Sequence, residues 1–128
     1  IVGAVNGHPT PEPPGHRVIS SQTASQLRTM LEGVFAEGGT AAAVSVPGYQ
    51  LAGKTGTANK IDPKTKAYSK TKYVASFVGF APAANPRLLI AVVVDEPKGD
   101  IYGGAVAAPA FGKIAEYALP YLRIPPSP

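Results

Sequence analysis

The run Gly53-Lys54-Thr55-Gly56-Thr57 is the part of this 128-residue chain that most limits what it can fold into. It places one ammonium group and two hydroxyls among glycines. It also follows Pro47-Gly48, a pair that is typical of a tight turn. Two interpretations compete for this run, a phosphate-binding loop and a β-strand that borders a groove, and they predict different chemistry.

The phosphate-loop interpretation rests on the formal match of residues 48–55 to the pattern G-x-x-x-x-G-K-[ST]. In such a loop a strand precedes the first glycine and a helix begins at the lysine. Here residues 49–52, Tyr-Gln-Leu-Ala, suit an extended strand better than an anion-binding bend. Residues 56–63 have no helical periodicity and contain the helix breakers Gly56 and Pro63. The surroundings of the motif therefore disfavour a nucleotide site.

A strand over residues 49–57 fits the sequence better. Because side chains alternate between the faces of a strand, Thr55 and Thr57 would share one face, about 7 Å apart, while Lys54 and Gly56 would face the other way. Two hydroxyls and a nearby ammonium suit the binding of a carboxylate, and Gly56 would let a neighbouring element approach the backbone closely. If the strand borders a cleft, its free edge could pair with an extended peptide.

Lys54-Thr55-Gly56 matches the K-T-G element of the penicillin-binding proteins and serine β-lactamases. Over residues 17–124 the chain resembles the C-terminal part of the transpeptidase domain of class B penicillin-binding proteins, particularly the cell-division type. Further matching segments occur in the same order: Gly38-Gly39-Thr40, Pro47-Gly48-Tyr49, Phe77-Val78-Gly79-Phe80-Ala81-Pro82, Asn85-Pro86-Arg87, Asp95-Glu96-Pro97 and Tyr102-Gly103-Gly104.

This resemblance implies a role for each residue of the motif. Lys54 would supply positive charge beside a catalytic serine, and the backbone N–H of Thr57 would form half of an oxyanion hole. Thr55 and Thr57 would hold a carboxylate of a β-lactam or of the acyl-donor peptide. Gly56 would keep its structural place, and Tyr102 would lie at the mouth of the cleft.

For the whole protein, the resemblance implies a serine-type peptidoglycan D,D-transpeptidase that cross-links stem peptides in septal wall synthesis and is acylated by β-lactams. It would act at the periplasmic face of the bacterial inner membrane, with cell-division proteins as partners and with no cofactor or metal. The membrane anchor would lie outside these 128 residues.

Two of the family's three catalytic elements have no counterpart in this sequence. S-x-N does not occur, and Ser69-Lys70-Thr71-Lys72 matches S-x-x-K only by letter, because no helix is expected there to present the serine hydroxyl. We therefore expect the segment to be inert alone, with the nucleophile supplied by the rest of the gene product or by another chain. A catalytically inactive sensor or binding module, a serine β-lactamase fragment and a P-loop protein remain as alternatives.

The composition excludes several other classes. Hydrophobic residues make up 45% of the chain and charged residues 16%, which fits a globular protein, and zero cysteines exclude disulfides and thiolate chemistry. Residues 54–72 contain six lysines and a single acidic residue, Asp62. No aromatic platform accompanies these lysines, so nucleic acid is not an expected partner. The longest apolar run, Leu88 to Val94, is too short to span a membrane. No His/Asp/Glu cluster has metal-ligand spacing.

The expected fold is α+β, with an antiparallel meander of three strands, part of a larger sheet, between an N-terminal and a C-terminal helix. Residues 1–20 form a proline-rich arm or loop, residues 21–124 the C-terminal half of a transpeptidase domain, and residues 125–128 a tail.

The strands are predicted at residues 49–57, 72–80 and 88–94. The last is apolar throughout, so we expect it to be covered on both faces. The first helix should begin at a Ser20 or Ser21 cap, run to about Ala36 with Met30 and Phe35 in the core, and end at Gly38-Gly39. The last helix should run from about Ala105 to Leu122, with Pro109 in its first turn. Its apolar stripe is expected at Phe111, Ile114, Ala115 and Ala118.

Overall fold

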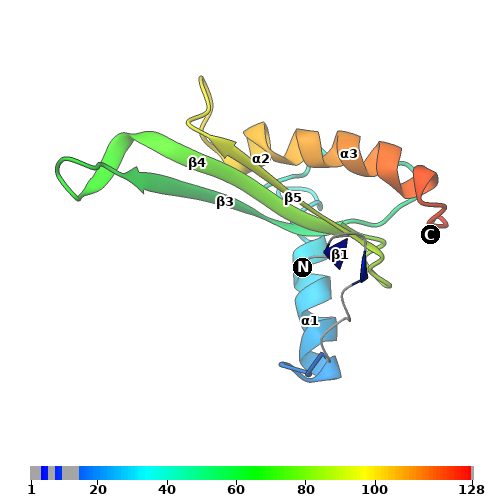
Figure 1. The fold of residues 1–128 in the computed structure, drawn as a ribbon. Coiled ribbons are helices and arrows are strands. Elements are labelled where there is room, and N and C mark those ends of the chain that lie inside the picture. Colours follow the sequence, from blue (N-terminus) through cyan, green and yellow to red (C-terminus); the bar gives the residue numbers. More distant parts are fainter. Residues whose placement is uncertain (1–3, 6–7, 10–14, 128) are drawn as a thin grey trace.

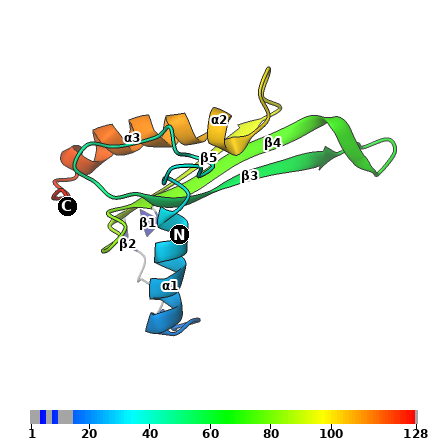
Figure 2. The ribbon, with the colours of Figure 1, turned by 180° about the vertical axis from the view of Figure 1, so that it is seen from behind.

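An antiparallel three-stranded sheet forms the centre of the computed structural model, which describes residues 4–5, 8–9 and 15–127. Figure 1 shows one helix lying along the upper side of the sheet and another projecting below it, and Figure 2 shows the same arrangement from behind. The predicted α+β class and the meander are confirmed. The elements are β1 (Ala4–Val5), β2 (His8–Pro9), α1 (Ser21–Glu32), β3 (Ala52–Ile61), β4 (Tyr68–Ala81), β5 (Leu88–Asp95), α2 (Gly103–Val106) and α3 (Ala108–Tyr121).

The sheet follows the chain order β3-β4-β5, and among the described residues the short strands β1 and β2 pair with each other and with no other strand. The proline-rich arm expected over residues 1–20 and the tail over residues 125–128 lie partly outside the described residues. Residues 15–20 form no helix or strand.

The Pro47-Gly48 turn forms as predicted, with Gly48 at a φ of 80° and the Tyr49 N–H donating to the Val46 carbonyl at 3.1 Å. The strand after it begins at Ala52, three residues later than expected, because the C-terminal segment binds the residues in between. The Tyr49 hydroxyl donates to the Ile124 carbonyl at 2.7 Å, and the Gln50 N–H donates to the Ser127 hydroxyl at 3.3 Å.

The hairpin of β3 and β4 is longer than the sequence predicted, since β3 continues to Ile61 and β4 begins at Tyr68. Cross-strand pairing extends to Ile61 opposite Tyr68, past a register shift that follows Asn59. The Asn59 side-chain amide donates to the Ser69 carbonyl at 2.8 Å and ties the strands together at this shift. The far end of the hairpin consequently projects well beyond the helices (Figure 1).

Helix α1 begins where predicted, because Ser20 caps it by accepting from the Thr23 N–H at 3.0 Å. Its expected end at Gly38-Gly39 is wrong: the helix stops at Glu32, with Gly33 at its C-cap, since glycine opposes helix by about 1 kcal/mol relative to alanine. The core position predicted for Met30 is also wrong, because its side chain is 70% exposed and no residue of α1 is buried. Phe35, beyond the helix, does pack against the core.

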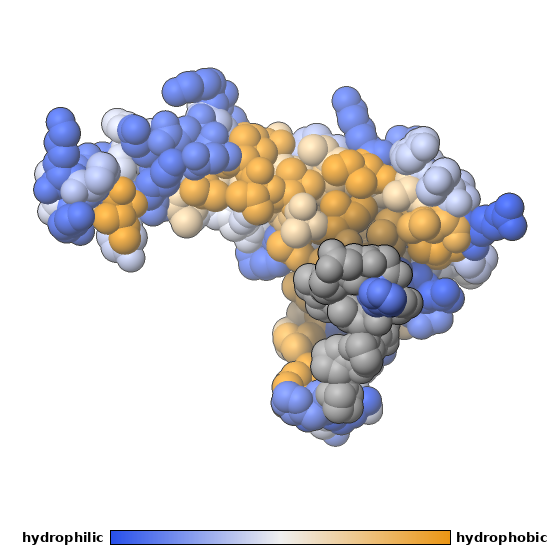
Figure 3. Space-filling model, in the orientation of Figure 1, coloured by the Kyte–Doolittle hydropathy of each residue, from blue (hydrophilic) through white to orange (hydrophobic). Residues whose placement is uncertain are grey.

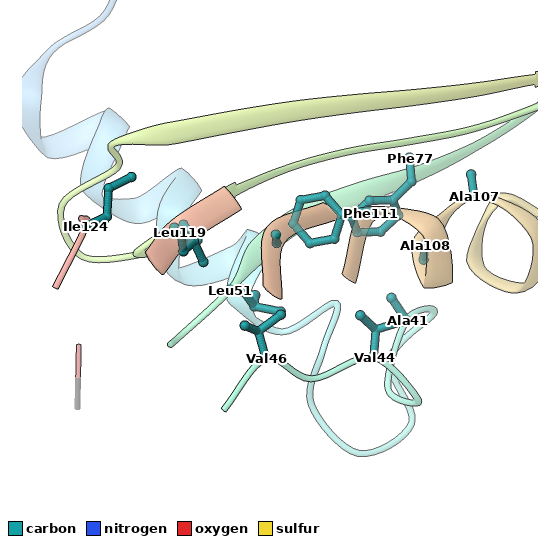
Figure 4. Close-up of a cluster of buried hydrophobic side chains, with 12 residues drawn as sticks. Ala41, Val44, Val46, Leu51, Phe77, Ala107, Ala108, Phe111, Leu119 and Ile124 are labelled. Carbon is teal, nitrogen blue, oxygen red and sulfur yellow. The ribbon is translucent and has the colours of Figure 1, made fainter. Parts of the chain in front are cut away.

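The core lies between the sheet and α3, around Phe77 of β4 and Phe111 of α3 (Figure 4). The two rings are fully buried with centroids 4.9 Å apart, and Phe35 meets Phe77 edge-on at 5.7 Å. The C-terminal helix is divided into α2 and α3 at Ala107, and Pro109 occupies the first turn of α3 as predicted. Leu119 is buried on α3, whereas Ile114, expected in the buried stripe, is 46% exposed.

Strand β5 is covered on one face only among the described residues, which corrects the expectation of two covered faces. Leu88, Ile90, Val92 and Val94 pack against the core, while Leu89 and Val93 are each 65% exposed. The reason is that α3 packs on one side of β4 and β5 and no described element covers the other. Figure 3 shows the resulting apolar band along the middle of the molecule.

Candidate functional site

The Lys54-Thr55-Gly56 motif lies within β3, at the outer edge of the described sheet. Residues 52–61 are extended throughout, so no helix begins at Lys54 and no phosphate-cradling bend precedes it. The P-loop alternative is therefore wrong. One edge of β3 pairs with β4, and no described strand covers the other edge.

Three threonines line a cavity beside this strand. Thr55 and Thr57 alternate with Gly56, opposite Phe77 and Ala75 of β4, and therefore lie on the same face. The Thr55 hydroxyl lies 3.2 Å from the hydroxyl of Thr40, which comes from the turn after α1. Together they line one side of a cavity of about 310 Å³, whose other wall is formed by residues 102–105.

The N-terminal end of α2 also lines this cavity. The backbone N–H of Gly103 donates to the Thr57 hydroxyl at 3.3 Å, which holds α2 against β3. A Cβ atom at Gly103 would overlap the Ser76 carbonyl and would lie 2.6 Å from the Gly56 carbonyl oxygen. Glycine is required at Gly103 because the helix backbone comes this close to the sheet backbone.

Gly56 also sits in a tight place, since a Cβ there would come within 2.5 Å of the Ser76 hydroxyl. Ser76 belongs to β4, whereas α2 is the element that approaches the Gly56 backbone, since a Cβ at Gly103 would lie 2.6 Å from the Gly56 carbonyl oxygen.

The Lys54 ammonium lies at the rim of the threonine cluster. Its side chain leaves the strand on the face opposite Thr55, as the alternation predicted. Because β3 is an edge strand, the ammonium reaches around the open edge and donates to the Thr55 carbonyl at 2.9 Å, with the Thr55 hydroxyl at 3.4 Å. The site thus combines one cation with hydroxyl groups, an arrangement suited to an anionic ligand.

Tyr102 lies at the mouth of the cavity, where its side chain is 65% exposed. Its backbone N–H donates to the Asp100 carboxylate at 2.9 Å, which fixes the turn that leads into α2. The structure therefore brings together all five residues singled out in the sequence: Lys54, Thr55, Gly56, Thr57 and Tyr102.

Sequence reasoning assigned no role to Thr40 or Gly103, although both lie within segments that carry the family resemblance. Sequence position alone could not show that they meet Thr55 and Thr57 across 15 and 46 residues. Ser69 lies elsewhere, within β4, where its hydroxyl accepts from the N–H groups of Thr71 and Lys72. The described residues contain no group of three His, Asp or Glu side chains placed to hold a metal ion.

Comparison with known proteins identifies the family of the chain. The sequence pattern of the penicillin binding protein transpeptidase domain matches residues 1–116. The chain belongs to the penicillin-binding-protein transpeptidase family. It is 48% identical over 111 residues to Stage V sporulation protein D of Bacillus subtilis, covering 86% of this chain and 17% of that protein. It is 43% identical over 116 residues to the probable peptidoglycan D,D-transpeptidase PenA of Neisseria gonorrhoeae, covering 90% and 20%.

A solved transpeptidase-family structure shows the same fold. Penicillin binding protein 3 of Mycobacterium tuberculosis, crystallised with ampicillin, superposes with a TM-score of 0.81 at 40% identity, over 94% of this chain and 28% of that one. This chain spans about a fifth of the length of the curated relatives it matches. In the parts of the chain that the structure describes, every helix is too short or too polar to cross a bilayer.

Proposed function

We propose that this chain is the KTGT-bearing part of a serine-type peptidoglycan D,D-transpeptidase, an acyltransferase that cross-links stem peptides and is acylated by β-lactams. The observation that carries the proposal is the gathering of the Lys54 ammonium with the hydroxyls of Thr40, Thr55 and Thr57 at the open edge of β3. Membership of the transpeptidase family, and the name of the PenA relative, support the reaction class.

In the proposed reaction a serine oxygen attacks the carbonyl carbon of the penultimate D-Ala of a stem peptide. A new ester bond forms, the amide bond to the terminal D-Ala breaks, and that D-Ala leaves with a proton on its amine. An amine of a neighbouring stem peptide then attacks the ester, which restores the serine and completes the cross-link. A β-lactam stops at the ester stage, because its opened ring stays attached to the acyl group.

The residues of this chain bind and stabilise; they do not attack. The terminal carboxylate of the donor peptide, or the carboxylate of a β-lactam, accepts hydrogen bonds from Thr55 and Thr57 beside the Lys54 charge. The Thr57 N–H donates to the oxyanion that develops on the reacting carbonyl. The donor peptide lies extended along the open edge of β3 and pairs with its backbone. The serine and its base are supplied by a part of the domain outside these 128 residues.

The test measures the rate of acylation of the full-length protein by a fluorescent penicillin, together with release of D-Ala from a stem peptide. Thr57→Val should lower both rates by about 10- to 100-fold, because a hydrogen bond to a charged group contributes about 1.5–3 kcal/mol. Thr71→Val is the matched control on the exposed part of β4 and should leave both rates unchanged. Equal rates in the wild type and Thr57→Val would overturn the assignment.

The same assays separate the alternatives. A serine β-lactamase would turn over a chromogenic cephalosporin repeatedly, whereas the proposed transpeptidase is acylated once and stays labelled. An inactive sensor would show no label at all in the full-length protein. We place the enzyme at the periplasmic face of the inner membrane, in septal synthesis with cell-division proteins as partners. Depletion of the protein in cells should therefore block septum formation before it affects elongation.

A further inference from the structure

The far end of the β3–β4 hairpin, residues 58–72, forms a projecting arm with a surface unlike the rest of the sheet. Figure 3 shows this end as mainly hydrophilic with a single apolar spot. The arm carries five lysines, at positions 60, 64, 66, 70 and 72, and one acidic residue, Asp62. A structural explanation exists for only part of this charge.

Two of the lysines fasten the root of the arm to the end of β5. The Lys60 ammonium contacts the Asp95 and Glu96 carboxylates at 2.8 and 2.9 Å, and Lys72 contacts Glu96 at 3.4 Å. The hydrogen bond that the Lys60 ammonium donates to Asp95, followed by the one it donates to Glu96, raises the pKa of Lys60, so its charge is held in this network. Lys60 and Lys72 therefore have a structural role.

The single acid of the arm is also committed to a structural role. The Asp62 carboxylate accepts from the N–H groups of Lys64 and Thr65 at 2.8 and 3.0 Å and so shapes the turn over residues 62–67. These backbone hydrogen bonds, led by that of Thr65, lower the pKa of Asp62. Within the described part of the chain, no ion pair engages Lys64, Lys66 or Lys70, and all three are exposed.

An apolar pair lies between these lysines. Ile61 and Tyr68 are cross-strand partners at the last pairing position of the hairpin, and they are 63% and 75% exposed. A cross-strand pair of this kind normally stabilises a sheet by packing under cover. Here no described helix covers it, and water reaches both side chains.

We propose that the arm is a docking site for an acidic segment of another protein, whose carboxylates meet Lys64, Lys66 and Lys70 and whose apolar side chain packs on Ile61 and Tyr68. The apolar pair favours a protein segment over a plain polyanion, because a glycan or phosphate polymer has no apolar side chains to cover it. The turn held by Asp62 and the ties between Asn59 and Ser69 and between Tyr73 and Lys70 give the arm a fixed shape. A fixed shape lowers the entropy cost of binding.

The alternative explanation is that the lysines on this exposed sheet edge prevent edge-to-edge aggregation. That explanation accounts for the charge but not for a large exposed apolar pair in its midst, since such a pair increases the risk of aggregation. The two accounts therefore predict different behaviour toward a ligand.

The experiment titrates the full-length protein with a labelled Glu-rich peptide that carries two Leu residues, with the same peptide carrying Ser in place of both Leu, and with polyglutamate. Fluorescence anisotropy is followed at low and at physiological salt. The protein variants are Lys64→Glu/Lys66→Glu/Lys70→Glu and Ile61→Ser/Tyr68→Ser. The matched control, Arg17→Glu/Arg87→Glu/Lys113→Glu, changes the net charge equally at exposed sites off the arm.

The Leu-bearing peptide should bind most tightly. The arm charge reversal should weaken its binding by about tenfold or more, whereas the control reversal should weaken it by less than about twofold. The Ile61→Ser/Tyr68→Ser variant should bind the Leu-bearing peptide only as tightly as the wild type binds the Ser-bearing peptide. If polyglutamate binds as well as the Leu peptide and the Ile61/Tyr68 variant changes nothing, the site takes polyanions and the proposal is overturned. The proposal is also overturned, in favour of edge protection, if the Leu-bearing peptide does not bind or if the control charge reversal weakens its binding as much as the arm charge reversal does.

Discussion

At the scale of single residues, Gly103 determines how near α2 can lie to β3, and thus where the Thr57 hydroxyl is held. Gly103→Ala adds a Cβ that overlaps the Ser76 carbonyl, so α2 must move and the bond from its N–H to Thr57 must lengthen. We expect a loss of about 1–3 kcal/mol in the free energy of unfolding and slower acylation by fluorescent penicillin.

Urea unfolding and the acylation rate check this prediction. Gly15→Ala is the control, because a Cβ at Gly15 meets nothing within 4 Å. Wild-type stability and rate in Gly103→Ala would show that α2 is not seated as described.

Thr40 is the residue of the cluster to which sequence reasoning assigned no role. Thr40→Val removes the hydroxyl that lies 3.2 Å from that of Thr55 while keeping the side-chain shape. We expect the second-order acylation constant to fall by about three- to tenfold, because the Thr55 hydroxyl loses a partner, with unfolding stability changed by less than about 1 kcal/mol. An unchanged constant would mean that Thr40 only packs beside the site.

At the scale of elements, local patterns predicted the existence of each large element and placed the motif on a strand. The Ser20 cap, the Pro47-Gly48 turn and Pro109 in the first turn of α3 are formed by neighbouring residues, and they lie where expected. The end of α1 was wrong although its cause is local, since Gly33 stops the helix, whereas the start of β3 was wrong because distant residues decide it. Strand β3 starts late because the C-terminal segment holds Tyr49 and Gln50, contacts that no local pattern contains.

The core of the sheet rests on two phenylalanines from β4 and α3. Phe77→Ala should lower the free energy of unfolding by about 3–5 kcal/mol, because its buried ring packs between Phe35 and Phe111. Lys113→Ala, at an exposed position on α3, should change it by less than about 0.5 kcal/mol. Denaturant titration of both variants measures the difference, and similar losses would argue against the core described.

The ion pairs at the root of the arm make stability depend on pH. Hydrogen bonds from Lys60, then Lys72, hold the pKa of Glu96 below its ordinary value of 4.5 in the folded state. The stabilisation is therefore fully present above about pH 4.5 and is lost as pH falls through the lower, folded-state pKa. Glu96→Gln should be less stable than the wild type near neutral pH, and the difference should shrink in acid.

Urea unfolding at several pH values between neutral and strongly acid conditions checks this prediction. Glu37→Gln, an exposed residue outside the network, is the control. A difference between the wild type and Glu96→Gln that stays constant into acid would contradict the pairing.

At the scale of the whole molecule, several large apolar side chains of the described residues are exposed. Val78, Leu89 and Val93 expose apolar side chains on the sheet, and Leu27 and Met30 do so on α1. The amphipathic pattern of α1 and the apolar run of β5 suggested buried positions. Burial there depends on cover that these residues cannot provide themselves, and the chain spans only about a fifth of its curated relatives.

The most direct test of the account locates the penicillin adduct by mass spectrometry, in the 128-residue chain and in the full-length protein treated alike. The account predicts no adduct on the 128-residue chain, and one adduct in the full-length protein on a serine outside it. A stoichiometric adduct on Ser69, or on any other serine of this chain, would contradict the claim that Lys54, Thr55 and Thr57 serve a nucleophile supplied from elsewhere.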